Sequence, residues 1–101
     1  MIFVSGQVAL DPATGEMKEV GVAEQTAQAI RNIKAILEEA GSSLEKVVKT
    51  TVLIVSMDDF STVNSAYSEF FKQDPPARAC FEVCALPKGA LVEIEAIAIS
   101  K

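Results

Sequence analysis

The spacing of hydrophobic residues divides the chain into six segments. Two segments repeat hydrophobic residues every three or four positions, which predicts amphipathic helices over 22–40 and 60–71. Short hydrophobic runs bounded by turn residues predict four β-strands, at 2–10, 46–55, 77–84 and 91–99. Gly41 is expected to end the first helix and Pro75-Pro76 the second, with Asp58 as the N-cap of the second helix.

This order of strand, helix, strand, helix, strand, strand predicts an α+β fold. The last two strands, joined by a turn at 86–90, are expected to form a hairpin within a mixed sheet that carries both helices on one face. A chain of 101 residues predicts one domain spanning 1–101. Domains of this size often leave apolar surface that partner subunits cover, so we expect an oligomer.

An arginine interrupts the third predicted strand. Because strand side chains alternate between faces, Arg78 and Cys80 are expected to share one face, with Phe81 on the other. The last strand alternates in the same way, with Glu93 opposite to its apolar neighbours. The helices are expected to cover the face that carries Phe81, Val83, Val92 and Ile94. Arg78 and Glu93 would then lie together on the uncovered face.

That pairing predicts a binding site for a small anion. A half-buried guanidinium needs an anion, and its planar fork can bind a carboxylate through two hydrogen bonds. A neighbouring glutamate can transfer protons. The plainer alternatives are a surface ion pair for Arg78 and solvent-exposed carboxylates for Glu93 and Glu95. Because the uncovered face is apolar in part, symmetric association is expected to cover it and to place the site near a subunit boundary.

The composition limits the reactions and the partners expected of this protein. The chain contains no histidine, which argues against metal-dependent hydrolysis and against Ser-His or Cys-His catalysis. Its net charge of −5 disfavours nucleic-acid binding. Cys80 and Cys84 would lie about 13 Å apart on a strand, too far for a disulfide, so they are expected to be free thiols. Without a signal-like or membrane-spanning segment, a cytoplasmic location is predicted, with no membrane partner.

Several motifs of the chain are typical of a known family. They are Val4-Ser5-Gly6-Gln7, Val48-Lys49-Thr50-Thr51-Val52, Phe60-Ser61-Thr62-Val63-Asn64, Pro76-Ala77-Arg78-Ala79-Cys80-Phe81-Glu82-Val83, Leu86-Pro87-Lys88-Gly89 and Val92-Glu93-Ile94-Glu95-Ala96. From end to end the chain resembles the Rid/YjgF/L-PSP family, the reactive intermediate deaminases. The resemblance implies a chorismate-mutase-like fold and a homotrimer with clefts between subunits.

The resemblance also implies an activity. Family members hydrolyse enamines and imines such as 2-iminopropanoate, releasing a 2-oxo acid and ammonia without a cofactor or metal. By motif position, Arg78 would bind the substrate carboxylate and Glu93 would position or activate the attacking water. The substrate-binding set would be completed by Ser5, Gly6, Cys80 and Asn64, with Cys80 acting chiefly through its backbone.

Alternative interpretations remain for these residues and for the function. Asn64 could satisfy a neighbouring backbone group, Cys80 could be a packing residue, and Ser5-Gly6 could be a strand bulge. Family members usually begin with a further strand that carries a cleft tyrosine, and this strand is expected to be missing here. A trimeric module that binds carboxylates or proteins without turnover is therefore one alternative. The other is an L-PSP-type endoribonuclease or translation inhibitor, which the acidic charge disfavours.

Overall fold

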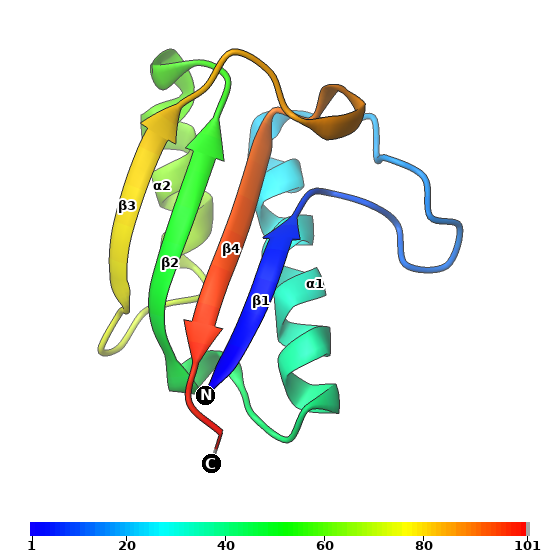
Figure 1. Cartoon of the computed structure of the whole chain (residues 1–101). Helices are drawn as coiled ribbons and strands as arrows, with labels where there is room; N and C mark the ends of the chain where they lie inside the picture. The colour runs from blue at the N-terminus through cyan, green and yellow to red at the C-terminus, as the bar shows by residue number, and fades with distance from the viewer. Residues whose placement is uncertain (101) are drawn as a thin grey trace.

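A four-stranded β-sheet forms the centre of the computed structural model, which describes residues 1–100, and two α-helices cover one of its faces (Figure 1). The α+β fold with both helices on one face is therefore confirmed. The elements in chain order are β1 (Ile2–Gln7), α1 (Val22–Glu39), β2 (Val47–Ile54), α2 (Phe60–Ser68), β3 (Ala77–Glu82) and β4 (Val92–Ala98).

The strand order in the sheet is β1-β4-β2-β3. β4 runs antiparallel to both of its neighbours, whereas β2 and β3 are parallel and are joined through α2. The predicted hairpin between the last two strands is therefore wrong, because β2 lies between them. The connection over 83–91 includes a 3-10 turn at Pro87–Gly89 and is long enough to carry the chain past β2.

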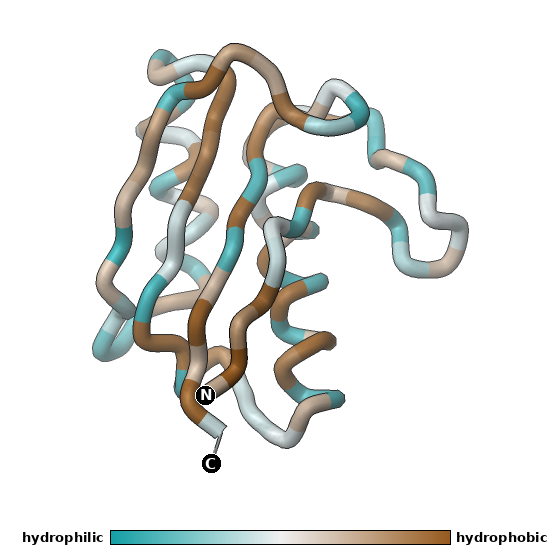
Figure 2. Tube along the Cα trace, in the orientation of Figure 1, coloured by the Kyte–Doolittle hydropathy of each residue, from teal (hydrophilic) through white to brown (hydrophobic). Residues whose placement is uncertain are grey.

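The hydrophobic core lies between the sheet and the helices. Ile30, Ile33 and Leu37 of α1 pack there against the buried face of β2 and β4, which is lined by Val52, Ile54 and Ile94. Burial of each such side chain contributes about 1.5–3 kcal/mol. Figure 2 shows the strands mainly in hydrophobic colours, with hydrophilic positions interrupting β4. The hydrophobic stripe of α1 and the alternating hydrophobic residues of the strands thus form the two surfaces that meet in this core.

The opposite face of the sheet, called the open face below, has no helix against it (Figure 1). Phe3 is 72% exposed there, and Phe81 is 55% exposed. Phe81 was expected beneath the helices, so that assignment is wrong. Large apolar side chains on one uncovered surface are typical of interaction sites. None of the helices within residues 1–100 is long and apolar enough to cross a membrane.

The start of α2 differs from the prediction. A 3-10 turn at Met57–Asp59 precedes the helix, and the side chain of Ser56 accepts a hydrogen bond from the backbone N–H of Asp58. Asp58 is therefore not the N-cap. The carboxylate of Glu82, at the end of β3, accepts a hydrogen bond of 2.7 Å from the backbone N–H of Met57. This bond ties the beginning of α2 to β3.

A polar side chain on α1 fixes the segment that follows β1. The Asn32 amide donates to the backbone carbonyls of Val8, at 3.2 Å, and Leu10, at 3.0 Å. Gln28 in turn donates to the amide oxygen of Asn32 at 2.8 Å. These carbonyls lie where the chain leaves the sheet. Asn32 is a donor to the Leu10 carbonyl and a second donor to the Val8 carbonyl, which also accepts from the backbone N–H of Leu10.

Replacing Asn32 with alanine should destabilise the fold. The Leu10 carbonyl would lose this donor and the Val8 carbonyl would keep only the backbone N–H of Leu10, so we expect the free energy of unfolding to fall by about 1–3 kcal/mol. Urea denaturation followed by circular dichroism measures this change. Lys34→Ala, at an exposed position on the same helix, is the control and should change the value by less than about 0.5 kcal/mol. Equal stabilities of the two variants would contradict the role of Asn32.

Candidate functional site

Arg78 lies on the helix side of β3, one of the two edge strands of the sheet. Its guanidinium donates a hydrogen bond of 2.7 Å to the side-chain oxygen of Asn64. The guanidinium carbon is 4.9 Å from the centre of the Tyr67 ring and 5.6 Å from that of Phe60. All three partners lie on α2, and Arg78 pairs across the sheet with Thr50 of β2.

The prediction that Arg78 shares the open face with Glu93 is therefore wrong. The run 77–84 is apolar on both of its alternating faces, so its pattern alone could not assign the covered side. The structure places Arg78 and Cys80 toward the helices, where aromatic rings and the Asn64 amide receive the cation, and leaves Phe81 on the open face.

The guanidinium keeps free hydrogen-bond donors. Arginine has five N–H groups, and Asn64 is the one side-chain acceptor that Arg78 meets within residues 1–100. No carboxylate in that part of the chain lies within ion-pair distance of Arg78; the ion pairs there are Arg31–Glu24 and Lys72–Glu69. A cavity of about 350 Å³ opens beside Arg78, and its other lining residues are Asn64, Tyr67, Ser68, Phe71, Pro75 and Pro76. This arrangement suits a small anionic ligand with an apolar part.

Tyr67 is buried beneath Arg78. Its hydroxyl lies 2.7 Å from the hydroxyl of Thr50, which is also buried. Burial raises the pKa of Tyr67 above its ordinary value of 10.0, although the Thr50 hydrogen bond and the Arg78 charge act in the opposite direction. The ring therefore stays neutral at physiological pH and presents its face to the cation.

Cys80 lies two residues beyond Arg78, partly buried against the core. Burial raises the pKa of its thiol, and the nearby Arg78 charge opposes this only in part. A thiol with a raised pKa is a poor nucleophile at neutral pH. Cys80 and Cys84 are both free, as predicted.

A second group of predicted site residues lies across the sheet. Glu93 is on β4 between the buried residues Val92 and Ile94, so it faces away from the helices. The β1–β4 pairing shifts register between Val4 and Gln7, which makes a bulge at Ser5-Gly6. A β-carbon at Gly6 would overlap the carboxylate of Glu93. Glycine at this position thus gives the Glu93 carboxylate its place against the β1 backbone.

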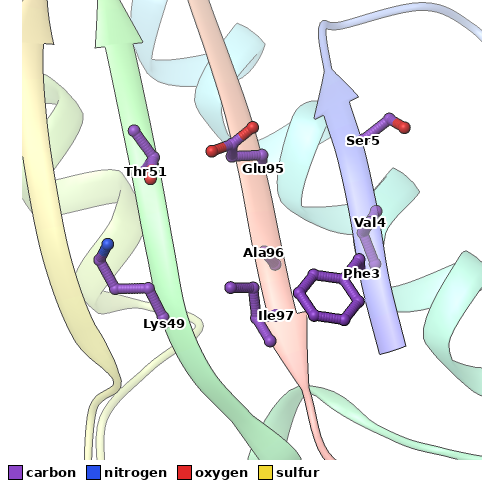
Figure 3. A pocket seen from close by; sticks show the side chains of 8 residues that line it. All are labelled: Phe3, Val4, Ser5, Lys49, Thr51, Glu95, Ala96 and Ile97. Carbon is purple, nitrogen blue, oxygen red and sulfur yellow. The ribbon is translucent and has the colours of Figure 1, made fainter. Parts of the chain in front are cut away.

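A shallow depression of about 310 Å³ lies on the open face near this bulge (Figure 3). Figure 3 shows Ser5, Thr51 and Glu95 at one end of it and Phe3, Lys49 and Ile97 at the other. Its lining includes Glu95 but not Glu93. The two acidic residues of β4 therefore have different surroundings, with Glu93 against Gly6 and Glu95 in the depression.

The six predicted site residues thus form two groups. Arg78, Asn64 and Cys80 lie beside α2, and Ser5, Gly6 and Glu93 lie at the β1–β4 edge of the sheet. Within one subunit the two groups are on opposite faces. The aromatic support of Arg78 was not anticipated, because the apolar stripe of α2 predicts only core packing for Tyr67 and Phe60.

Comparisons with known proteins agree with the resemblance seen in the sequence. The family model described as Endoribonuclease L-PSP matches residues 1–100. The human 2-iminobutanoate/2-iminopropanoate deaminase is 50% identical over 98 residues, covering 97% of this chain and 72% of the human protein.

Solved structures agree as well. The YjgF protein of E. coli superposes with a TM-score of 0.90 at 44% identity, covering 98% of this chain and 80% of that one. E. coli TdcF with bound serine gives a TM-score of 0.92 at 40% identity over the same shares.

The surroundings of Tyr67 predict the direction of its titration. Because it is the single tyrosine and the chain has no tryptophan, the ultraviolet absorbance of tyrosinate reports it directly. The folded protein should titrate above 10.0 and the urea-unfolded chain near that value. The stability gained from this shift is fully present below the unfolded pKa and is lost as pH rises through the folded pKa. A folded pKa at or below 10.0 would contradict this account.

Proposed function

Because this chain belongs to the Endoribonuclease L-PSP family, the Rid/YjgF proteins, we propose that it hydrolyses 2-imino acids and their enamine tautomers to 2-oxo acids and ammonia. The observation that carries the proposal is 50% identity to the human 2-iminobutanoate/2-iminopropanoate deaminase over nearly the whole chain. The free donors of Arg78, beside a cavity with an apolar wall, supply the carboxylate recognition that such substrates require. The serine bound to TdcF likewise carries a carboxylate.

The proposed reaction needs positioning and proton transfer. Arg78 binds the substrate carboxylate, and Asn64 fixes the guanidinium. The backbone of Cys80, two residues further along β3, lines the same edge of the site. Glu93 positions a water molecule and accepts its proton as the water oxygen bonds to the imine carbon. That proton passes to the imine nitrogen, which has taken up the π electron pair, and a carbinolamine results. Glu93 then accepts the hydroxyl proton and delivers it to the nitrogen as the carbonyl forms and the carbon–nitrogen bond breaks, so that ammonia leaves. The Ser5 hydroxyl and the Gly6 backbone line the side of the cleft that faces the water.

In this proposal each active site combines two subunits of a homotrimer. Arg78 and Glu93 lie on opposite faces of one sheet, so a small substrate cannot touch both within one subunit. A ring of subunits with heterologous contacts would bring the Arg78 edge of one copy to the Glu93 face of the next. The exposed side chains Phe3 and Phe81 on the open face favour such association. The free thiols suit a reducing compartment such as the cytoplasm.

Complementation between inactive variants tests the shared site. Arg78→Ala and Glu93→Gln should each lower kcat/KM for 2-iminopropanoate, made in situ by an amino-acid dehydratase, by about 100-fold or more. Mixed trimers of the two should regain activity, because in each of them about one interface in three joins an intact Arg78 to an intact Glu93. Coexpression with two different tags and sequential affinity purification yields the mixed oligomers. Mixed oligomers no more active than the separate variants would contradict a site shared between subunits.

Gly6→Ala tests the placement of Glu93 without removing the carboxylate. The new methyl group would displace the carboxylate, so we expect kcat to fall at least about tenfold while the protein stays folded. Gly21→Ala is the matched control, because Gly21 has φ of −69° and open space around its β-carbon position. Circular dichroism checks the fold of both variants. A Gly6→Ala variant as active as Gly21→Ala would argue against this role of Glu93.

A further inference from the structure

We propose that Tyr67 is a positioning residue whose ring, fixed by Thr50, orients the guanidinium of Arg78 for the substrate carboxylate. This inference rests on the proposed function, because it assigns Arg78 to carboxylate binding. It concerns a side chain that would not itself touch the reacting atoms.

The first support is the short distance between the guanidinium and the ring. The guanidinium carbon lies 4.9 Å from the centre of the Tyr67 ring, within the range of a cation–π contact. Asn64 accepts one guanidinium N–H at 2.7 Å. The ring contact and the Asn64 hydrogen bond together restrict the guanidinium, and Arg78 lines the cavity beside them.

The second support is that the ring itself is held in place. The Tyr67 hydroxyl lies 2.7 Å from that of Thr50, which is 1% exposed. The Phe71 ring packs against Tyr67 with centroids 4.7 Å apart. Thr50 also pairs with Arg78 across β2 and β3. The contacts therefore close a loop, from Arg78 through the strand pair to Thr50, to Tyr67 and back to Arg78.

The consequence is a guanidinium ordered before the substrate arrives. An arginine side chain has many rotamers, and binding normally loses that freedom. Ordering in the free protein removes this loss from the binding step. Loss of the ring should therefore act mainly on KM, because Arg78 grips the carboxylate in the ground state as well as in the transition state.

The test is a set of Tyr67 variants measured alone and in the Arg78→Ala background. Tyr67→Leu should lower kcat/KM about 3- to 30-fold, mostly through KM. In Arg78→Ala, the same change should lower kcat/KM no further, because the group it positions is gone. Tyr67→Phe keeps the ring but loses the Thr50 hydrogen bond that fixes it, so its kcat/KM should fall between those of wild type and Tyr67→Leu.

A control separates positioning from simple destabilisation. Phe70→Leu truncates an aromatic side chain just after α2 that packs on the core, so it should lower the melting temperature without changing kcat/KM. The proposal is overturned if Tyr67→Leu matches wild type, if its effect persists in Arg78→Ala, or if Tyr67→Phe is as impaired as Tyr67→Leu.

Failure of the proposed function would give a different result. Wild-type protein would then release no 2-oxo acid above the uncatalysed rate. Pyruvate binding, followed by nuclear magnetic resonance, would still test Tyr67, because Tyr67→Leu should weaken it by a similar factor. Absence of pyruvate binding by wild type, or equal affinities of wild type and Tyr67→Leu, would overturn the inference.

Discussion

The contact between the guanidinium of Arg78 and helix α2 determines how this protein can form an active site. The Asn64 amide and the Tyr67 ring hold the cation on the helix side of β3, and no carboxylate within residues 1–100 neutralises it. Glu93, the proposed catalytic carboxylate, lies across the sheet against Gly6. Each group is well supported by its own surroundings, and the two are separated by the thickness of the sheet. Association of subunits is the simplest way to join them.

Other features of the fold agree with this interpretation. Gly6, in the bulge of β1, has no side chain and leaves room for the Glu93 carboxylate. The backbone of β1 and the Glu93 side chain of β4 therefore lie against each other. Exposed Phe3 and Phe81 make the open face unfavourable in water. The same association would bury this apolar surface and complete the site.

Much of the fold could be predicted from the sequence, because the periodicity of α1 and the β-branched run of β2 leave few alternatives. The hairpin prediction failed because strand order depends on where the 83–91 connection runs, which no local pattern encodes. Strand alternation suggested Arg78 and Glu93 as candidate site residues, and motif resemblance predicted their roles and added Ser5, Gly6, Cys80 and Asn64. Arg78 was assigned to the wrong face of the sheet because β3 is apolar on both of its faces. The contact of Tyr67 with Arg78 could not be predicted, because an aromatic residue on the apolar face of a helix equally indicates core packing.

The central claim is that one substrate is held by Arg78 of one subunit and served by Glu93 of the next. A crystal structure of the protein with pyruvate tests it most directly. We expect the pyruvate carboxylate on the Arg78 guanidinium, with a Glu93 carboxylate from a neighbouring subunit close to the carbonyl carbon. Pyruvate bound through Arg78 with no neighbouring subunit in contact, or bound away from Arg78 altogether, would contradict it.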